Sequence, residues 1–461
     1  MTQTAFSTLN LKPELLSNLS TLDYKEMTPI QAQSLPIILQ HKDVIAQAKT
    51  GSGKTAAFGL GLLHNLDVKR FRIQSLVLCP TRELADQVAK EIRKLARSIH
   101  NIKVLTLCGG LPFGPQIGSL EHGAHIVVGT PGRIQDHLIK GRLDLSNLNT
   151  FVLDEADRML EMGFQDAIDD IIEQMPTDRQ TLLFSATYPP QIKSIANRIM
   201  RSPETVKAES QHSESTIKQH FYRISNDEQR LTAVRQLLMQ HQPESCVIFA
   251  NTKRETQQIA DDLADYGFSA IGLHGDLEQR DRDQTLVRFA NKSTSVLVAT
   301  DVAARGLDID ALDLVINYHL SFDPEVHVHR IGRTGRAGSE GVACSLFSDK
   351  DVTKIIALED YLGQSIQDES LPPMSVLDQP IYSPKMATLR IDGGKKQKVR
   401  PGDILGALTG DKTIAGSSIG KIHRFDFCSY VAVSKEMANQ ALKKLENGKI
   451  KGRQFRVWRV R

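Results

Sequence analysis

The sequence lacks the runs of about 18 apolar residues that a membrane span needs, and its first residues show no basic segment followed by an apolar core. It has only five cysteines in 461 residues, never in a Cys-x-x-Cys pair. Their number and spacing argue against a disulfide framework and a zinc site. We therefore expect a cytoplasmic protein with no membrane partner, whose cysteines are small buried residues.

Aromatic residues are also scarce, at 5% of the chain, so the sequence offers no obvious dimer surface and we expect a monomer. His327 and His329 stand two residues apart. No cysteine, aspartate or further histidine stands near them at ligand spacing, so we do not expect a metal there. The chain length predicts about three domains.

Charge is distributed unevenly along the chain. Residues 379–461 hold 18 Lys and Arg against 6 Asp and Glu, whereas the rest holds 39 against 48. A basic tail on an acidic body indicates a polyanionic partner. The alternative is a solvated basic surface.

Short β-branched apolar runs alternate with amphipathic segments, a pattern typical of parallel strands covered by helices on both faces. It predicts two tandem α/β domains with parallel sheets, residues 1–206 and 207–363, joined by a polar segment at 207–218. Prolines at 372, 373, 380 and 384 mark a linker over 364–384. Residues 385–461 follow a βαββαβ order, which predicts a small α+β domain like an RNA-recognition module. The expected strands are residues 43–48, 75–79, 126–129, 150–153, 181–184, 245–250, 270–273, 295–299 and 314–317.

A phosphate-binding loop follows the first expected strand and opens a helix. Its glycines let backbone N–H groups surround phosphate oxygens, Lys54 supplies charge to the β and γ phosphates, and the Thr55 hydroxyl can bind Mg²⁺. Ala48 stands where the eight-residue pattern has its first glycine. The loop is formed by Ala48, Lys49, Thr50, Gly51, Ser52, Gly53, Lys54 and Thr55.

Two carboxylates follow a buried strand, at the sheet edge where open α/β domains bind ligands. We assign Asp154 to the metal and Glu155 to orienting the attacking water. Alone, the sequence DEAD would suggest only an acidic turn. Because the chain also has a phosphate loop, we favour a catalytic role for these carboxylates.

An ordered series of motifs resembles the DEAD-box RNA helicase family over residues 6 to about 345. The motifs are TPIQ (28–31), AKTGSGKT (48–55), PTRELA (80–85), TPGR (130–133), DEAD (154–157), SAT (185–187), ATDVAARGLDI (299–309) and HRIGRTGRAG (329–338). The resemblance implies that the two α/β domains are RecA-like and that the chain is an RNA-stimulated ATPase, using ATP and Mg²⁺, that locally unwinds short RNA duplexes.

The resemblance also implies residue roles. Adenine is read by Phe6, Tyr24, Thr28 and Gln31, which favours ATP over GTP, although Gln31 alone would suggest a solvent-facing helix residue. Asp301 contacts the ribose, and Arg333 and Arg336, beside Arg330, act as arginine fingers, where the alternative is a solvated arginine cluster. Ser185 and Thr187 couple nucleotide state to domain arrangement. RNA contacts come from Arg82, Gly110, Thr130, Arg133, Arg282 and Thr300.

The tail resembles that of bacterial DbpA-type helicases in residues 391–410, 419–422 and 448–457, which implies a hairpin of large-subunit ribosomal RNA and pre-50S particles as partners. Its strands offer few aromatics for base stacking, only Phe427 and Tyr430 near the central strand. We therefore expect RNA contacts from Lys395, Lys396, Lys398, Arg400, Lys449, Lys451 and Arg453, with a generic basic surface as the alternative.

Two other functions share some of these features. A processive DNA helicase would have the same phosphate loop and arginines, but the TPIQ, DEAD and SAT motifs and the basic tail count against it. An RNA-binding assembly factor with a vestigial ATP site is disfavoured by the intact Lys54, Glu155 and Arg336.

Overall fold

The computed structural model describes residues 4–48, 51–208, 217–304, 312–335 and 340–460. By its internal contacts the chain divides near residue 213 into two compact units. The second unit holds an α/β core domain and the small tail domain. None of the described helices is long and apolar enough to cross a membrane.

The first unit is a seven-stranded, fully parallel sheet with the order β3-β4-β2-β5-β6-β1-β7. Its central strands are buried along their whole length, which explains their continuous apolar sequences. The strands are β1 (Val44–Gln47), β2 (Ser75–Leu78), β3 (Val104–Leu107), β4 (Ile126–Gly129), β5 (Thr150–Asp154), β6 (Gln180–Ser185) and β7 (Glu204–Lys207).

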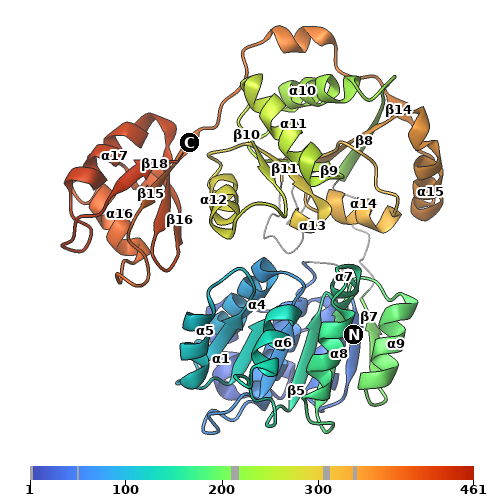
Figure 1. Cartoon of the computed structure of the whole chain (residues 1–461), viewed down its shortest axis with the longest axis vertical. Coiled ribbons are helices and arrows are strands. Elements are labelled where there is room, and N and C mark those ends of the chain that lie inside the picture. The colour runs from blue at the N-terminus through green and yellow to red at the C-terminus, as the bar shows by residue number, and fades with distance from the viewer. Residues whose placement is uncertain (1–3, 49–50, 209–216, 305–311, 336–339, 461) are drawn as a thin grey trace. The chain divides into compact units, whose positions relative to one another are not determined.

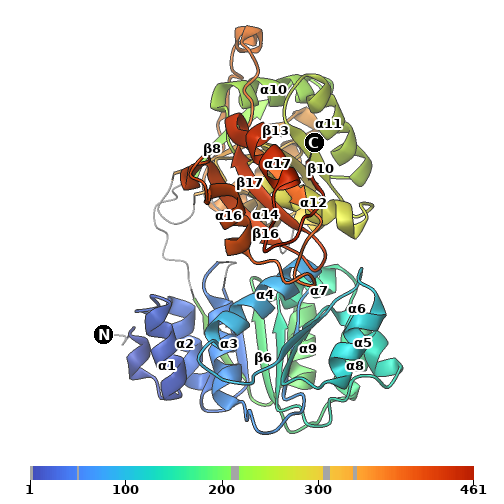
Figure 2. The ribbon, with the colours of Figure 1, turned by 90° about the vertical axis from the view of Figure 1, so that its left-hand side faces the viewer.

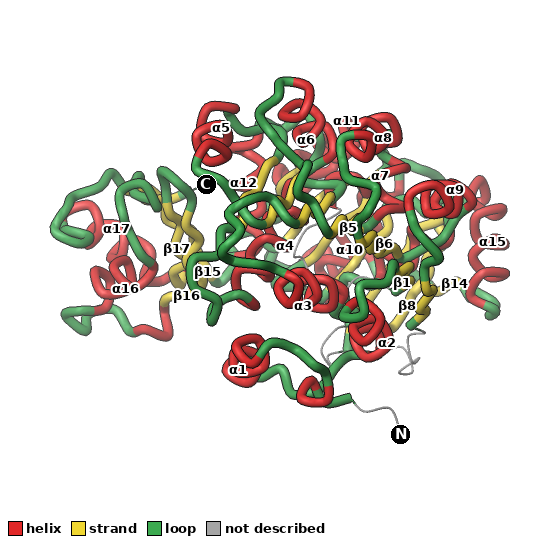
Figure 3. The backbone as a smooth tube through the Cα atoms, turned by 90° about the horizontal axis from the view of Figure 1, so that it is seen from below, coloured by secondary structure: helices red, strands yellow, loops and turns green. Residues whose placement is uncertain are grey.

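Helices cover both faces of this sheet, so the unit has two separate apolar cores. Beside strands β1, β5 and β6, helices α2 and α3 lie on one side and α8 and α9 on the other (Figures 2 and 3). The helices are α1 (Pro13–Thr21), α2 (Pro29–Ile38), α3 (Lys54–Asn65), α4 (Arg82–Leu95), α5 (Phe113–Glu121), α6 (Pro131–Ile139), α7 (Ala156–Glu161), α8 (Gln165–Glu173) and α9 (Pro190–Ile199).

The second unit begins with another seven-stranded parallel sheet, of order β10-β11-β9-β12-β13-β8-β14 (Figure 1). Its strands are β8 (Ile217–Arg223), β9 (Cys246–Ala250), β10 (Ala270–Leu273), β11 (Val296–Thr300), β12 (Leu314–Asn317), β13 (Gly341–Phe347) and β14 (Asp368–Glu369). Its helices are α10 (Gln229–His241), α11 (Lys253–Asp265), α12 (Gln279–Ala290), α13 (Asp301–Ala304), α14 (Pro324–Ile331) and α15 (Val352–Leu362).

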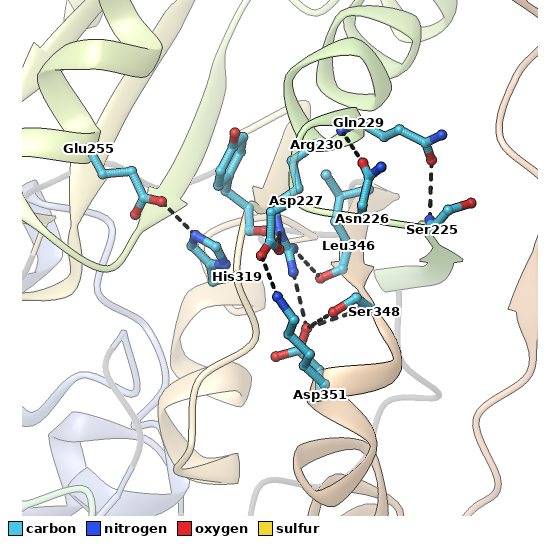
Figure 4. Close-up of polar contacts among 12 residues, drawn as sticks. Ser225, Asn226, Asp227, Gln229, Arg230, Glu255, His319, Leu346, Ser348 and Asp351 are labelled. Carbon is cyan, nitrogen blue, oxygen red and sulfur yellow. Dashed lines mark hydrogen bonds and ion pairs between the residues drawn. The ribbon is translucent and has the colours of Figure 1, made fainter.

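A buried arginine holds part of this core domain together (Figure 4). The Arg230 side chain is 2% exposed and bonds to Asp227 at one end of its guanidinium and to Asp351 at the other, at 2.9 and 3.1 Å. It also donates to the carbonyls of Tyr318 and Leu346. All three nitrogens of the Arg230 guanidinium therefore have hydrogen-bond partners, as burial of a charged group requires.

The tail domain is a four-stranded antiparallel sheet of order β16-β17-β15-β18 with two helices on one face (Figure 1). The elements are β15 (Met386–Ile391), α16 (Pro401–Thr409), β16 (Ile419–Arg424), β17 (Ser429–Ser434), α17 (Ala438–Asn447) and β18 (Val457–Arg459). Two parallel α/β sheets followed by a βαββαβ domain confirm the expected fold class.

Some strands were missed by the sequence pattern. β3, β7, β8, β13 and β14 carry polar or small residues within short runs, and β3, β7 and β14 lie at the ends of their sheets. The segment 364–384, predicted as a linker, contributes β14 and a 3₁₀ turn, Met374–Asp378, and packs Val376 and Ile381 against the second core domain. Most of the polar segment at 207–218 lies outside the described residues.

Candidate nucleotide and RNA sites

Three motifs meet at one edge of the first sheet. The phosphate loop follows β1, the DEAD segment begins at the end of β5, and the SAT segment begins at the end of β6. These strands are neighbours in the order β5-β6-β1, so their carboxyl ends lie side by side. This is the edge at which open α/β sheets bind ligands.

The phosphate loop has the backbone of an anion cradle. Gly51 and Gly53 both have positive φ, 81° and 91°, and Gly53 caps the N-terminus of α3. Lys54 is only 6% exposed, and its Nζ donates to the Ala48 carbonyl at 2.8 Å. Helix N-termini and glycine-lined loops present N–H groups to phosphates. Lys49 and Thr50 of the predicted loop lie outside the described residues.

The first turn of α2 braces this loop. The Thr28 hydroxyl donates to the Ser52 carbonyl at 2.7 Å, and Gln31 Nε2 donates to the Gly53 carbonyl at 3.0 Å. Gln31 Oε1 accepts from the Thr28 backbone N–H at 2.9 Å. Gln31 is 2% exposed, so it does not face solvent as the alternative interpretation had it. A side chain at Gly53 would collide with the Gln31 amide.

Phe6 and Tyr24, predicted to read adenine, lie against each other with ring centroids 6.2 Å apart, edge to face. Phe6 is buried in the core of the first unit. Tyr24 is half-buried, and its hydroxyl donates to Glu91 of α4 at 2.8 Å. The structure therefore fixes both rings, while their contact with adenine stays a prediction.

The two predicted catalytic carboxylates differ in environment. Asp154 is 2% exposed, and its Oδ1 has no hydrogen-bond partner among the described residues. Burial raises the pKa of Asp154 to about 7, although the Lys54 charge opposes the rise. Glu155 has a φ of 53°, an uncommon left-handed conformation for glutamate. Thr55 is half-buried in the first turn of α3.

These oxygens fit a divalent cation. A buried carboxylate oxygen without a partner is costly unless a proton or cation compensates it. Carboxylate and hydroxyl oxygens are the hard ligands that Mg²⁺ prefers. Asp154 and Thr55 are therefore suited to hold the metal of a nucleotide complex.

A residue that the sequence reasoning did not assign links two motifs. Asp157 Oδ2 accepts from both the backbone N–H and the hydroxyl of Thr187, each at 2.9 Å. The Asp157 backbone N–H donates to the Ser185 hydroxyl at 3.3 Å. The predicted coupling residues Ser185 and Thr187 are thus tied to the DEAD segment. The motif spelling places Asp157 near the site but does not show this bond.

The predicted RNA residues of the first unit follow the other strands of the same sheet. Arg82 opens α4 after β2, Gly110 with φ 73° follows β3, and Thr130 precedes α6 after β4. Arg133 is 8% exposed; its guanidinium donates to the Leu111 carbonyl at 2.9 Å. Arg133 therefore holds the loop after β3, and its direct contact with RNA stays a prediction.

In the second unit, Thr300 ends β11 and Asp301 begins α13. Both carboxylate oxygens of Asp301 accept from Arg330, so the predicted ribose contact is oriented by an arginine that had no assigned role. Arg282 of α12 donates to the Ala303 carbonyl at 2.9 Å. Arg333 follows α14, and Arg336 lies outside the described residues.

The predicted basic residues of the tail lie in two loops that meet. Lys451 Nζ donates to the Lys398 carbonyl at 3.2 Å, which joins the loop before α16 to the loop before β18. Lys395 and Lys396 donate their backbone N–H groups to the carbonyls of residues 425 and 426. The exposed side chains of these loops include Lys395, Lys396, Arg400, Lys449, Lys451 and Arg453.

The centre of the other face of the tail sheet packs against the second core domain. Thr388 of β15 is fully buried, and its hydroxyl bonds to Asn291 Nδ2 at 3.1 Å and to the Ser293 hydroxyl at 2.7 Å. Tyr430 is 2% exposed, whereas Phe427 in the loop before β17 is 67% exposed. The central part of the face on which ordinary RNA-recognition sheets stack bases is thus buried here.

Comparison with protein families matches three models in series. A DEAD/DEAH box helicase model covers residues 28–195, a helicase conserved C-terminal domain model covers 229–338, and a DbpA RNA binding domain model covers 388–459.

Individual relatives agree with these models. The chain is 56% identical to the ATP-dependent RNA helicase DbpA of Escherichia coli (strain K12) over 98% of this chain and 99% of that protein. It is 36% identical to the ATP-dependent RNA helicase DbpA of Bacillus subtilis (strain 168), over 98% of both. Among solved structures, S. cerevisiae Dbp5 bound to RNA and ADP BeF3 matches with a TM-score of 0.71 and 32% identity, covering 81% of this chain and 97% of that one.

Proposed function

The chain belongs to the DEAD-box ATP-dependent RNA helicases of DbpA type, and from this we propose that it remodels short duplexes of large-subunit ribosomal RNA during assembly of the 50S subunit. It would act in the cytoplasm, as a monomer, on pre-50S particles. The observation that carries the proposal is the pairing of a complete helicase core with a tail whose two basic loops meet through Lys451 and Lys398.

We propose that the first unit binds ATP through the loop braced by Thr28 and Gln31. Lys54 would neutralise the β and γ phosphates, and Glu155 would orient the attacking water. Mg²⁺, held by Asp154 and Thr55, would supply charge neutralisation at the phosphates. Arg333 and Arg336 of the second unit would stabilise the charge that develops on the γ phosphate.

The hydrogen bonds from Thr187 to Asp157 support a coupling role for the SAT segment. Loss of the γ phosphate would change the contacts of Asp154 and Glu155. Because Asp157 in the same segment is bonded to Thr187, the position of the chain at the end of β6 would change with it. The predicted RNA residues lie at the ends of β2, β3 and β4 of the same sheet, so backbone contacts made there would be sequence-tolerant.

The tail is proposed to supply substrate choice. Because Thr388 on the sheet face is bonded to Asn291 and Ser293, we assign recognition of the hairpin to the basic loops and the exposed Phe427. Lysine and arginine side chains on two adjoining loops suit the phosphates of a structured hairpin, read by shape.

The test is ATP hydrolysis with no nucleic acid, with ribosomal RNA, with unrelated structured RNA and with DNA. The intact chain is compared with a triple variant, Lys395→Ala with Lys396→Ala and Lys449→Ala, and with a triple control of the same charge change at exposed tail lysines outside these loops, Lys412→Ala with Lys421→Ala and Lys443→Ala. We expect selective stimulation by ribosomal RNA, lost in the triple variant and kept in the control. Equal stimulation of all variants by all RNAs would show that the tail binds RNA without selecting it. No stimulation by any RNA would contradict the proposed activity.

A further inference from the structure

A cavity of about 440 Å³ lies where the second core domain, the connecting segment and the tail domain meet. Three parts of the chain far apart in sequence contribute to its walls. The residues used below are Ser269 and Arg288 of the core domain, Tyr382 and Ser383 of the connector, and Lys435 and Arg459 of the tail. This size falls within the range of about 300–1,000 Å³ that is usual for ligand pockets.

The charge of the lining has a single sign. Arg288, Lys435 and Arg459 are cationic, and no carboxylate belongs to the lining. None of the three forms an ion pair with a carboxylate of the described residues, and Lys435 Nζ donates only to the Ser383 hydroxyl, at 3.0 Å. Elsewhere in the same region the cations Lys292 and Lys385 are both paired with Glu244.

Arg288 is half-buried and is the least exposed cation of the group. It projects from α12, and burial lowers the pKa of its guanidinium without any opposing contribution from an acidic group. A cation that is removed from water without a partner is unfavourable, and a bound anion would compensate it. Lys435 and Arg459 are exposed and approach the same space from the tail.

We propose that this cavity binds a phosphate of the RNA backbone, so that the strand is held at the junction of the core and tail domains. It goes beyond the proposed function, which places RNA on the first sheet edge and on the tail loops. Guanidinium, ammonium and hydroxyl donors are the groups that proteins use for phosphate oxygens. Arg288 and Arg459 approach the ligand from different domains, so the contact joins the two.

The cavity suits a phosphate better than a base or an apolar ligand. Its single aromatic ring, Tyr382, is partly buried against the core of the second domain and forms a T-shaped pair with Phe268, with centroids 6.2 Å apart, so the ring is already engaged. Contacts of this kind position a strand and do not read sequence. We therefore expect the site to raise affinity for any RNA strand that leaves the tail-bound hairpin.

The test measures the salt dependence of RNA binding by the full chain. A fluorescent RNA hairpin with a single-stranded extension is titrated at several salt concentrations between about 50 and 200 mM, and affinity is read from anisotropy. The variants are Arg459→Ala and Lys435→Ala, and the control is Lys443→Ala, which removes the same charge from an exposed tail residue outside the lining.

We expect the slope of log affinity against log salt to become shallower by about 1 in each pocket variant and to stay unchanged in the control. Thermal melts of every variant establish that the fold is retained. A second arm follows the melting temperature of the intact chain in inorganic phosphate, where we expect stabilisation that Arg459→Ala removes.

Normal RNA binding by the intact chain with equal slopes in all variants would overturn the pocket proposal alone. Stabilisation by inorganic phosphate with unchanged RNA slopes would also overturn it, because the pocket would then take a free anion and not RNA. An intact chain that binds no RNA would overturn the proposed function together with the pocket.

Discussion

Arg330 holds Asp301 at two points: its Nε and Nη2 donate to the two carboxylate oxygens of Asp301, each at 2.7 Å. The same guanidinium donates to the His319 carbonyl, also at 2.7 Å, and is 2% exposed. The side chain of Asp301, the first residue of α13, is therefore held in one orientation by a residue of α14. Lysine, which has a single charged nitrogen, cannot reproduce this two-point contact.

Arg330→Lys should raise KM for ATP about tenfold with a smaller change in kcat, because hydrogen bonds to charged groups contribute about 1.5–3 kcal/mol and Asp301 would lose its orientation. Steady-state ATPase assays at saturating RNA measure both constants. Arg254→Lys on the exposed face of α11 is the control. A lower melting temperature with unchanged KM would show that the pair is structural only and that Asp301 does not contact ribose.

Gln31→Ala should weaken ATP binding about tenfold, because it removes the bonds to the Gly53 carbonyl and to the Thr28 N–H that brace the phosphate loop. Gln31→Glu keeps the acceptor for Thr28 and loses the donor for Gly53, so it separates the two contacts. Nucleotide titrations with ATP and GTP give the readout, and Gln33→Ala, exposed on the same helix, is the control. Equal loss for both nucleotides would indicate a bracing role without adenine selection.

Glu155→Gln should lower kcat about 10²- to 10⁴-fold while ATP and RNA still bind, because only the orientation of the attacking water is lost. Single-turnover hydrolysis and equilibrium binding measured on the same variant distinguish the two effects. Glu173→Gln at the exposed end of α8 should leave both unchanged. A large loss of ATP affinity in Glu155→Gln would show instead that the left-handed turn after Asp154 had been disturbed.

Arg230→Met should destabilise the second core domain by about 3 kcal/mol, because two buried carbonyl groups would lose their donor and Asp351 would keep only Lys354 and Ser348 as partners. Urea unfolding of that domain measures the change. Arg223→Ala breaks the exposed ion pair with Asp349 and should cost much less, because solvent screens exposed charges. Similar losses in the two variants would contradict the distinction between buried and exposed pairs.

Acid stability depends on the same cluster (Figure 4). Burial acts to raise the pKa of Asp351, but hydrogen bonds from Lys354 and the Ser348 N–H, with the Arg230 charge, lower it from 3.8 to about 2. Since the folded pKa lies below the unfolded one, this stabilisation is present above about pH 4 and is lost as the pH falls towards 2. Asp351→Asn should therefore make the free energy of unfolding less dependent on pH in that window. An unchanged slope would show that other carboxylates cause the pH dependence.

The sequence was sufficient to place the phosphate loop, the carboxylates and the SAT segment at one sheet edge, because each follows a short apolar strand. It could not reveal that Asp157 bonds to Thr187, nor that Arg330 orients Asp301. Those partners lie 30 and 29 positions apart, and their contact depends on strand order.

The tail shows the same limit. Its basic residues and its order of elements could be predicted from composition and pattern. That Lys451 would reach the Lys398 carbonyl depends on the loop geometry, in which both residues have positive φ, 52° and 60°. The burial of Thr388 against Asn291 and Ser293 depends on packing between domains, which no local pattern encodes.

That burial has a consequence for moving the tail between proteins. A graft of residues 385–461 onto another helicase core would carry Thr388 and Tyr430 on a sheet face that the donor core had kept from water. Unless the recipient core also has counterparts of Asn291 and Ser293, the grafted domain would be joined to it by the connecting chain alone and would not pack against it. Modularity in this chain therefore resides in the tail together with the loop after α12.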